Sequence, residues 1–343
     1  MLQGIASALQ RHWWRPDRSL LVQALRPLSW VYAGLAALAR RFQRPAARVP
    51  RPTIVVGNLI VGGAGKTPAV VALVLALKQA GWRPGVISRA HGSAGQGLRA
   101  VQRNSQVSLV GDEPLLIHRR TGVPVWVGRS RSAVARALCA AHPEVNLLVS
   151  DDGLQHRRLA RDLELIVFDE RGVGNGLLLP AGPMRQALPL ALLPHQWVLY
   201  NAASRSTPLP GSMAQRRLGP ALPLERWWVG SSRGALSLPE LARLAGPELW
   251  AVAGIAAPER FFNMLRDAGL AFHTLALPDH HAFDTLPWPE GSADVIVTEK
   301  DAVKLAGREL GTTRVWVVGL DFVLPPMLLQ ILLSELRHIT DPP

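Results

Sequence analysis

Residues 53–68 have the sequence TIVVGNLIVGGAGKTP, and this stretch decides the fold. The β-branched run at residues 54–56 predicts a buried strand, and the apolar residues 69–77 predict a helix. Pro68 suits the first turn of that helix, because the first turn makes no use of the N–H that proline lacks. The stretch therefore predicts a strand, a tight glycine loop and a helix, which together direct backbone N–H groups at a bound phosphate.

The glycine loop matches the phosphate-binding pattern G-x-x-x-x-G-K-[ST], except that Ile60 stands where the first glycine belongs. Lys66 can reach the outer phosphates of a nucleoside triphosphate, and Thr67 can hold Mg²⁺. A glycine-rich turn without a ligand is the alternative. It is disfavoured because Gly-Lys-Thr follows a strand and precedes a helix, as triphosphate binding requires. The predicted nucleotide-binding residues are Ile60, Val61, Gly62, Gly63, Ala64, Gly65, Lys66 and Thr67.

Apolar strands alternate with helical segments after the loop, and this order predicts an α/β fold with a parallel sheet. In such sheets the chemistry gathers beyond the carboxyl ends of the strands. The predicted strands cover residues 86–88, 123–127, 145–150 and 163–168.

Asp151 and Asp152 follow directly after the predicted strand at residues 145–150. A carboxylate in this place can hold Mg²⁺ or its waters next to Thr67. An Asx turn or a helix cap is the alternative, and the sequence leaves open which aspartate contacts the metal. The candidate metal ligands are Thr67, Asp151, Asp152 and Gln155.

Arg185 lies in a loop rich in glycine and proline, residues 175–186. Its guanidinium can stabilise the charge on a phosphoryl group during transfer. A solvated surface arginine is the alternative. The Asp-His-His sequence at residues 279–281 lacks the spread of ligands that a zinc site needs.

The chain has 343 residues, a length that favours two domains. Ser, Pro, Gly and Arg are frequent at residues 201–223, which indicates a linker. We expect an N-terminal helix (residues 1–44), a P-loop-type parallel-sheet domain (45–205), a linker (206–225) and a smaller α/β domain (226–343).

The formal net charge is +13, and most of it lies at the N-terminus. Residues 1–51 hold nine arginines against one acid, Asp17, a net charge of +8. Outside that segment the sequence has no basic strand or helix interleaved with aromatic residues, so we expect no nucleic-acid partner. The single cysteine, Cys139, excludes an internal disulfide and fits a reducing cytoplasm.

Residues 19–39 form an apolar run that an Arg-Pro pair interrupts, so neither half reaches the ~20 apolar residues that span a bilayer. Arginines flank the run, and Trp13, Trp14 and Trp30 are of the residue type that prefers a membrane interface. This composition predicts a helix on the surface of an anionic leaflet. A core helix, a spanning helix and a secretory signal are the alternatives. Export is disfavoured because it would strand a cytoplasmic nucleotide site.

The motifs, taken in order over residues 20 to 305, resemble those of the tetraacyldisaccharide 4′-kinase family, lipid A pathway enzymes that phosphorylate a membrane-embedded lipid disaccharide. The resemblance implies two α/β domains joined by a short β linker, with a membrane-associating N-terminal helix. The matching motifs are Gly57-Asn58-Leu59, Gly62-Gly63-Ala64-Gly65-Lys66-Thr67-Pro68, Gly111-Asp112-Glu113-Pro114, Asp151-Asp152-Gly153-Leu154-Gln155-His156, Leu179-Pro180-Ala181-Gly182-Pro183-Met184-Arg185, Ala253-Gly254-Ile255, Asp279-His280 and Thr298-Glu299-Lys300-Asp301-Ala302-Val303-Lys304.

The resemblance also implies a reaction, which is transfer of a phosphate from ATP, with Mg²⁺, to the 4′-hydroxyl of a tetraacyldisaccharide 1-phosphate, giving lipid IVA. It implies peripheral or monotopic attachment to the cytoplasmic face of the bacterial inner membrane, and no obligate protein partner. By resemblance Asp112 is the base and His280 assists it, while Lys66 and Arg185 complete the catalytic set. We expect Asp112 and His280 on different domains, so that closure assembles the site and limits hydrolysis of ATP by water.

Three positions depart from the family pattern. Ile60 replaces a small hydroxyl residue, Ala90-His91 replaces a Gly-Tyr pair, and Gln186 replaces a frequent glutamate. The rival function is that of a membrane-associated partition or targeting ATPase, whose loops also contain Gly-Gly-x-Gly-Lys-Thr. Those loops usually carry a lysine just before the Gly-Gly pair, where this chain has Val61. Phosphate transfer to a lipid disaccharide separates the two functions.

Overall fold

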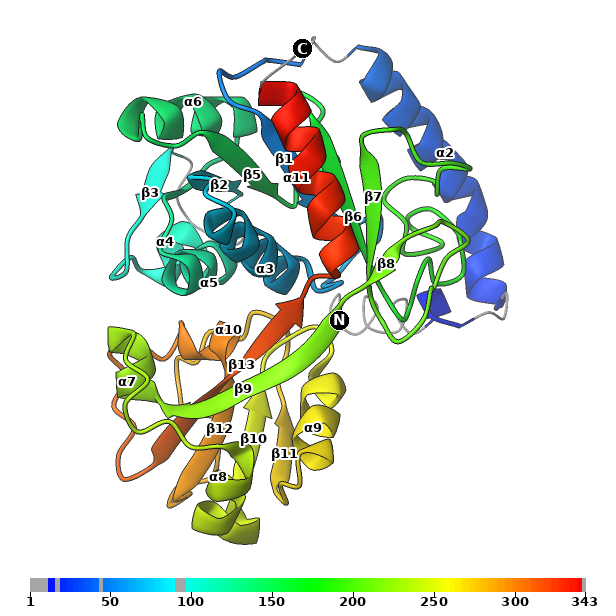
Figure 1. Ribbon diagram of the computed structural model, residues 1–343. Helices are drawn as coiled ribbons and strands as arrows, with labels where there is room; N and C mark the ends of the chain where they lie inside the picture. Colours follow the sequence, from blue (N-terminus) through cyan, green and yellow to red (C-terminus); the bar gives the residue numbers. More distant parts are fainter. Residues whose placement is uncertain (1–11, 16–18, 43–45, 90–96, 341–343) are drawn as a thin grey trace. The chain divides into compact units, whose positions relative to one another are not determined.

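The computed structural model describes residues 12–15, 19–42, 46–89 and 97–340. The chain forms two compact units (Figure 1). The first contains Met1–Arg89, Gly128–Gln215 and Leu324–Pro343, and the second contains Ala90–Val127 and Arg216–Val323. The Ala90-His91 departure lies outside the described residues.

The first unit is built on a parallel sheet with the strand order β2-β5-β1-β6-β7-β8. Strand β1 is buried along its whole length, as its continuous apolar run predicted. The parallel α/β fold expected from the sequence is confirmed. The strands are β1 (Thr53–Gly57), β2 (Pro84–Ser88), β5 (Leu147–Asp151), β6 (Leu163–Asp169), β7 (Gln196–Asn201) and β8 (Ser212–Met213).

The helix predicted after the glycine loop is confirmed as α3, which begins at Lys66 and buries most of its apolar residues. In Figure 1, α3 and α11 both cross in front of the strands of this sheet. Because β1 lies between β5 and β6, the loop at the carboxyl end of β1 is flanked by the ends of two parallel neighbours. The helices of this unit are α2 (Leu20–Arg41), α3 (Lys66–Gln79), α6 (Arg131–Ala141) and α11 (Pro326–Thr340).

The second unit contains a five-stranded sheet with the order β11-β10-β12-β13-β9. Its strands are β9 (Gln215–Pro223), β10 (Trp250–Ala253), β11 (His273–Ala276), β12 (Asp294–Thr298) and β13 (Arg314–Val323). Its helices are α7 (Leu224–Val229), α8 (Leu238–Ala245), the 3₁₀ helix η1 (Gly246–Glu248), α9 (Pro258–Asp267) and α10 (Glu299–Ala302).

The same unit also contains an earlier part of the chain, residues 97–127 among the described residues. There β3 and β4 pair antiparallel, and helices α4 and α5 lie between them in the sequence. The elements are β3 (Arg99–Val101), α4 (Val107–Val110), α5 (Asp112–Thr121) and β4 (Val125–Val127).

The two compact units differ from the division expected from the sequence. The segment Ala90–Val127, expected in the P-loop domain, clusters with the second unit, and Leu324–Pro343 clusters with the first. The physical reason lies in α5, which packs against α10 and is joined to it by an ion pair between Arg120 and Glu299. The predicted linker at residues 206–225 is largely strand, since it contains β8 and β9.

Helix α2 continues through Pro27, so the Arg-Pro pair interrupts the apolar run without ending the helix. Leu20–Ala39 is long and apolar enough to cross a membrane by length and composition, with a mean hydropathy of 1.2. Only 11% of that window is buried, which does not fit the alternative of a core helix. The exposed large apolar side chains of this segment are Leu20, Leu21, Leu28, Trp30, Val31, Leu35 and Leu38.

One face of α2 docks on the loop that carries Arg185. The Ser29 hydroxyl donates a hydrogen bond to the Leu178 carbonyl at 2.8 Å, and the Tyr32 hydroxyl donates to the Arg185 carbonyl at 2.9 Å. The position of this loop therefore depends on the N-terminal helix.

Candidate active site

Two glycines shape the loop between β1 and α3. Gly62 has φ = 92° and Gly65 has φ = 84°, values that favour glycine over residues with a side chain. Gly65 is also the N-cap of α3 and offers no side chain to its first N–H groups. These N–H groups are thus directed at the space above the helix, where an anion such as a phosphate is stabilised.

Ile60 and Val61 hold the loop in place through contacts with the core and with a neighbouring loop. The Ile60 side chain is fully buried and packs against Ala64 and Met184, while the Val61 N–H donates to the Pro183 carbonyl at 2.8 Å. An apolar side chain at position 60 therefore fills space in the core, which accounts for the departure from the glycine pattern. Both residues were predicted among the nucleotide-binding residues, and the structure places them in the support of the loop.

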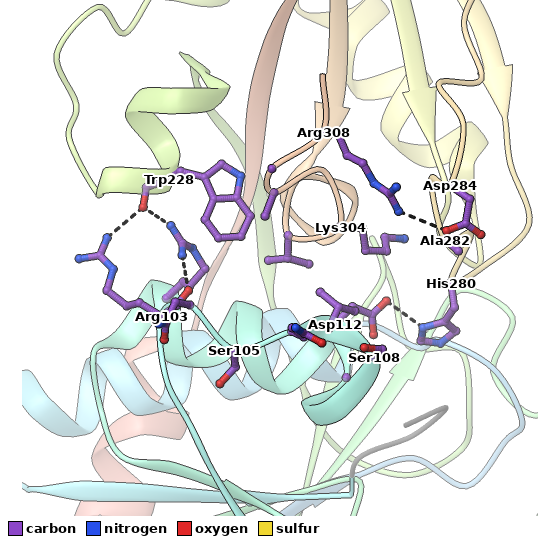
Figure 2. Close-up of a pocket in the computed structure, with 18 residues that line it drawn as sticks. Arg103, Ser105, Ser108, Asp112, Trp228, His280, Ala282, Asp284, Lys304 and Arg308 are labelled. Carbon is purple, nitrogen blue, oxygen red and sulfur yellow. Dashed lines mark hydrogen bonds and ion pairs between the residues drawn. The ribbon is translucent and has the colours of Figure 1, made fainter. Parts of the chain in front are cut away.

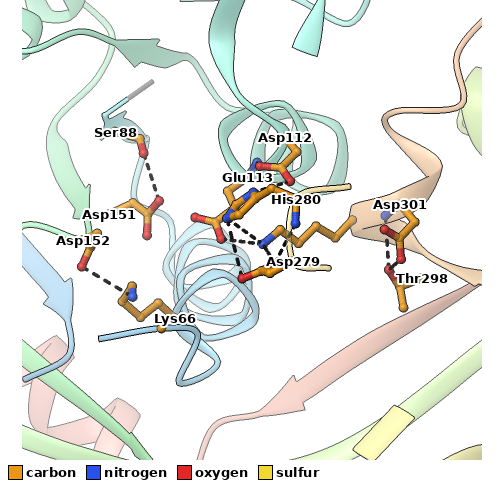
Figure 3. Close-up of polar contacts among 12 residues, drawn as sticks. Lys66, Ser88, Asp112, Glu113, Asp151, Asp152, Asp279, His280, Thr298 and Asp301 are labelled. Atoms are coloured by element: carbon orange, nitrogen blue, oxygen red, sulfur yellow. Dashed lines mark hydrogen bonds and ion pairs between the residues drawn. The ribbon is translucent and has the colours of Figure 1, made fainter. Parts of the chain in front are cut away.

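Five residues form what we call the P-loop cluster: Asn58, Lys66, Asp152, Gln155 and Arg185. The Lys66 ammonium donates to Asn58 Oδ1 at 3.2 Å and lies 3.6 Å from Asp152 Oδ1 (Figure 3). Arg185 Nη1 donates to Asp152 Oδ1 at 3.3 Å and to Gln155 Oε1 at 3.4 Å. Gln155 Nε2 in turn donates to the Asn58 carbonyl at 3.0 Å. The structure thus brings together four residues selected from the sequence.

Asp152 balances the positive charge of this cluster. Burial by itself would raise the pKa of the Asp152 carboxyl, but Lys66 and then Arg185 outweigh that effect and hold the pKa below its ordinary value. Its backbone adopts φ = 48°, an uncommon conformation for a residue with a side chain. The carboxylate therefore stays ionised and holds two cations close to the glycine loop.

Thr67 and Asp151 provide oxygen atoms at the head of α3 and at the end of β5, and Asp151 is in register with Val56 of β1. Asp151 Oδ2 accepts a hydrogen bond from the Ser88 hydroxyl at 3.0 Å. The described residues include no cluster of three His, Cys, Asp or Glu side chains that could hold a metal. Mg²⁺ commonly uses only one or two carboxylates and completes its shell with phosphates and waters. The donor set therefore fits Mg²⁺ bound together with a triphosphate.

Two arginines in this unit, the buried Arg131 and the partly buried Arg171, were missed by the sequence reasoning. Arg131 Nη2 donates to the Asp151 carbonyl at 3.0 Å. Arg171 pairs with Asp169 at 2.7 Å and donates to the Gly63 carbonyl at 2.6 Å. Asp169 is the last residue of β6, but no pattern in the sequence connects Arg171 to the glycine loop or Arg131 to Asp151.

A second cluster lies in the other unit and consists of Asp112, Glu113, Asp279, His280 and Lys300; we call it the Asp112 cluster. Asp112 is the first residue of α5, where the partial positive charge of a helix N-terminus favours a carboxylate. His280 Nδ1 lies 2.8 Å from Asp112 Oδ2, within hydrogen-bonding distance (Figure 3). The pairing of Asp112 with His280 expected from the family resemblance is thus present.

Lys300 joins the remaining members of the Asp112 cluster. Its ammonium donates to Glu113 Oε1 at 3.1 Å and to Asp279 Oδ1 at 3.0 Å. Burial would lower the pKa of Lys300, but Glu113, Asp112 and Asp279 together raise it. Lys300 therefore remains a cation beside Asp112.

The pKa of Asp112 is lowered to about 2 by this environment. Burial acts in the opposite direction, but the hydrogen bond with His280 and the charges of Lys300, His280 and Lys304 prevail. The same hydrogen bond raises the pKa of His280. Asp112 is consequently a buried, ionised hydrogen-bond acceptor.

Asp112 and His280 were expected on different domains. In the division into two compact units both cluster in the second unit, where they are in contact. The reason is that α5 clusters with the unit that carries residues 278–284, so no closure between units is needed to form this pair.

The motif at residues 298–304 anchors the second unit. The fully buried Asp301 accepts hydrogen bonds from the Gly254 N–H at 3.0 Å, from Thr298 Oγ1 at 2.7 Å and from the Lys304 ammonium at 3.0 Å. A carboxylate with three donors fixes the start of α10. Lys300, one residue earlier, is thereby held at Asp112.

Comparison with known proteins gives consistent results. The family model for LpxK, tetraacyldisaccharide-1-P 4′-kinase, matches residues 21–337. The chain is 51% identical over 341 residues to tetraacyldisaccharide 4′-kinase from Methylibium petroleiphilum, covering 97% of this chain and 94% of the relative. It is 45% identical over 337 residues to the enzyme of that name from Dechloromonas aromatica, covering 97% of this chain and 98% of the relative.

The fold also matches a solved structure. LpxK from Aquifex aeolicus, crystallised in complex with ATP, superposes with a TM-score of 0.72. The match covers 92% of this chain and 100% of that one, at 24% sequence identity. This likeness supports the α/β architecture described above.

Proposed function

Because the chain belongs to the tetraacyldisaccharide-1-P 4′-kinase family, we propose that its two clusters divide the work of a phosphotransferase between them. The enzyme transfers a phosphate from ATP to the 4′-hydroxyl of a tetraacyldisaccharide 1-phosphate. The P-loop cluster holds the triphosphate, and the Asp112 cluster receives the hydroxyl.

The P-loop cluster is suited to hold the triphosphate. Gly62 to Thr67 contribute backbone N–H groups, and Lys66 and Arg185 contribute charge. Asp152 keeps both cations in place through the contacts at 3.6 and 3.3 Å before a nucleotide arrives. Bound triphosphate then competes with Asp152 for these cations, and so the site is preorganised for an anion.

Mg²⁺, held by Thr67 and Asp151, would neutralise charge on the phosphates. We assign Asp152 the role of holding the side chains of Lys66 and Arg185, because both lie next to its carboxylate. Gln155 is assigned to positioning, since its side chain contacts Arg185 and the Asn58 carbonyl.

The ionised Asp112 carboxylate, held by His280 at 2.8 Å, is the observation that carries the assignment of the acceptor site. In the reaction a bond forms between the 4′-oxygen and the γ-phosphorus, and the bond from that phosphorus to the bridging oxygen of ADP breaks. The proton of the hydroxyl passes to Asp112. A carboxyl with a pKa near 2 is a weak base. It suffices because the loose transition state of phosphoryl transfer requires orientation of the hydroxyl more than its early deprotonation.

We also propose that α2 rests on a membrane surface. Its docked face contacts the Arg185 loop, and its other residues expose a row of leucines and Trp30. Substituting two exposed residues, Trp30→Ser and Leu35→Ser, should weaken sedimentation with anionic vesicles at high salt, because burial of apolar surface is not screened. Leu244→Ser, an exposed leucine of α8, is the matched control. Unchanged sedimentation of the α2 variant would contradict the proposal.

The decisive test of function is a kinase assay with ATP, Mg²⁺ and a detergent-dispersed tetraacyldisaccharide 1-phosphate. We expect a product with a second phosphate on the disaccharide. ATP hydrolysis that vesicles stimulate, without transfer to the lipid, would instead support the rival partition or targeting ATPase.

A further inference from the structure

Three neighbouring strands of the parallel sheet carry side-chain hydrogen-bond donors at their carboxyl ends. The strands are β1, β6 and β7, which lie side by side in that order (Figure 1). Asn58 follows directly after β1, Arg171 comes two residues after β6, and Asn201 is the last residue of β7. Arg171 and Asn201 lie outside the P-loop cluster and have no role in it.

Each of these donors holds one carbonyl of the glycine loop. The three hydrogen bonds run from Asn58 Nδ2 to the Gly62 carbonyl at 3.1 Å, from Arg171 Nη2 to the Gly63 carbonyl at 2.6 Å, and from Asn201 Nδ2 to the Ala64 carbonyl at 3.2 Å. The three carbonyls are consecutive in the sequence, and they meet the strands in the order of the sheet. The loop therefore crosses the strand ends with these carbonyls turned towards them.

A held carbonyl also sets the direction of the next N–H group, because the C=O and N–H of a planar trans peptide point in opposite directions. The N–H groups of Gly63, Ala64 and Gly65 are thus turned away from the strand ends. In the part of the chain that the structure describes, none of the three donates to another backbone group. Successive N–H groups on one side of a loop, directly before Lys66, form an arrangement that binds anions.

Arg171 is itself held from two sides. Its guanidinium pairs with Asp169, a fully buried carboxylate at the end of β6, through Nη2 at 2.7 Å and Nε at 2.9 Å. Its Cζ atom lies 4.4 Å from the centroid of the Trp14 ring, close enough for a cation–π contact. Because Asp169 engages its charge and the Gly63 carbonyl engages Nη2, Arg171 is suited to fix a peptide rather than to bind a phosphate directly.

Asn201 is fixed by the sheet. It is 4% exposed and lies in register with Asp169 on the neighbouring strand. Its partner Ala64 is fully buried. A buried carbonyl without a donor costs free energy, so without this amide the peptide after Ala64 should turn to find another partner. The N–H of Gly65 would then turn with it and leave the anion-binding side of the loop.

We propose that Asn58, Arg171 and Asn201 are positioning residues that hold the glycine loop in its phosphate-binding conformation before ATP arrives. The inference rests on the proposed function, in which this loop holds the triphosphate, and it adds the side chains that set the direction of its N–H groups. The peptides are then ordered during folding rather than on binding, which favours tight binding of the phosphates.

The test is equilibrium binding of two probes, ATP with Mg²⁺ and inorganic tripolyphosphate, to the full-length protein without lipid. Asn201→Ala should weaken binding of ATP by about tenfold, the scale of one hydrogen bond. Tripolyphosphate should lose the same factor, because it consists of the phosphates alone. The KM for the lipid should not change. A wild type that binds ATP but not tripolyphosphate would place the affinity outside the loop and overturn the proposal.

Arg171→Gln should weaken both probes by about tenfold or more, since it removes a charge-assisted hydrogen bond. Arg171→Lys should recover part of the loss, because the ammonium retains the charge and a donor. Asn201→Ala leaves every ion pair of the unit intact, so it tests the proposal even if Arg171→Gln does not fold. Circular dichroism verifies the fold of each variant. Unchanged binding in both Asn201→Ala and Arg171→Gln would overturn the proposal.

Two control variants remove a side chain that bonds to the backbone elsewhere. Asn146 lies directly before β5, and its Oδ1 accepts from the Arg83 N–H at 2.8 Å. Arg103, in the second unit, donates to the Trp228 carbonyl at 3.4 Å (Figure 2). Asn146→Ala and Arg103→Gln should bind tripolyphosphate like the wild type. Equal weakening in either control would show a general loss of stability and overturn the proposal.

Amide NMR signals of the free protein give a readout that a general structural role would not move selectively. In Asn201→Ala the signals of Gly63, Ala64 and Gly65 should shift or broaden, and saturating tripolyphosphate should return them towards their wild-type positions. Changes spread over the whole sheet would contradict the proposal.

The binding measurements also separate this proposal from the kinase assignment. Absence of transfer to the lipid by the wild type, with tripolyphosphate binding retained and weakened in Asn201→Ala, would refute the kinase assignment and leave the role of the loop donors intact. Transfer by the wild type, with binding unchanged in both Asn201→Ala and Arg171→Gln, would do the reverse.

Discussion

The P-loop cluster and the Asp112 cluster contain the same kinds of charged side chain, but the charge left available for a ligand has the opposite sign. In the P-loop cluster one carboxylate, Asp152, holds two cations, Lys66 and Arg185. In the Asp112 cluster, His280 and the nearby charge of Lys300 keep one carboxylate ionised. The first arrangement leaves excess positive charge for an anionic ligand, whereas the second leaves an oxygen acceptor for a hydroxyl.

The comparison shows that the kind of ligand such a cluster can accept depends on its excess charge. A cluster with more cations than carboxylates suits an anion, whereas a cluster with an available carboxylate suits a hydrogen-bond donor. In both clusters the charged side chains have partners of opposite sign in the free protein, as buried charges require. Substitutions in the two clusters should therefore fail in different kinetic parameters, and this difference makes the assignment testable.

The largest effect is expected in the P-loop cluster. Lys66→Ala should reduce transfer by about 10³-fold or more while the fold is retained, because it removes the charge nearest the glycine loop. The assay is kcat at saturating ATP with Mg²⁺, with circular dichroism to verify folding. Lys78→Ala, in the last turn of the same helix, is the control and should behave like the wild type. Near-normal turnover of Lys66→Ala would refute the P-loop assignment.

Asp112→Asn should lower kcat by about 10²-fold, the usual scale for loss of an acid–base group. Affinity for ATP should change little, since the nucleotide is assigned to the other cluster. Steady-state kinetics with ATP varied and the lipid saturating would measure both parameters, and Asp267→Asn on α9 serves as control. If ATP binding fell and kcat were retained, Asp112 would belong with the nucleotide and the contrast between the clusters would be lost.

A smaller effect, about tenfold in kcat, is expected for His280→Gln, together with a change in pH dependence. Loss of the hydrogen bond and charge of His280 removes stabilisation of the ionised Asp112, so the pKa of Asp112 rises from about 2. The acid limb of kcat/KM should consequently move to higher pH. The pH–rate profile of the variant tests this directly, because kcat/KM reports on the free enzyme. An unmoved acid limb would show that His280 does not control this carboxyl.

The effect of pH on stability has a defined sign as well. Asp112 has a lower pKa in the folded protein than in the unfolded chain, so its ionised form stabilises the fold above pH 4. That contribution, about 2 kcal/mol at 1.36 kcal/mol per pKa unit, should be lost as the pH falls from about 4 towards 2. Chemical unfolding of the wild type and Asp112→Asn across this range measures it, and equal pH dependence of the two would contradict it.

Local sequence patterns were sufficient to predict the glycine loop and the elements next to it. Residues 54–56 are β-branched and continuous, so a buried parallel strand was predictable, and Gly-Lys-Thr before a helix indicated the proposed phosphate site. Asp152 and Gln155 were selected because they follow a strand that belongs at the same sheet edge. Each of these predictions relies on contacts between neighbours in the sequence or on the fixed geometry of a parallel sheet.

The sequence by itself thus determined the α/β class, the glycine loop proposed to bind phosphate, and the residues at the ends of the strands. Only the tertiary structure decided that Ala90–Val127 clusters with the second unit, that Lys300 lies beside Asp112, and that Arg103 and Arg119 meet at Trp228. The physical reason is that local patterns report which residues a helix or strand buries. The partner of a buried charge, often more than 100 residues away, is set by packing of the whole unit.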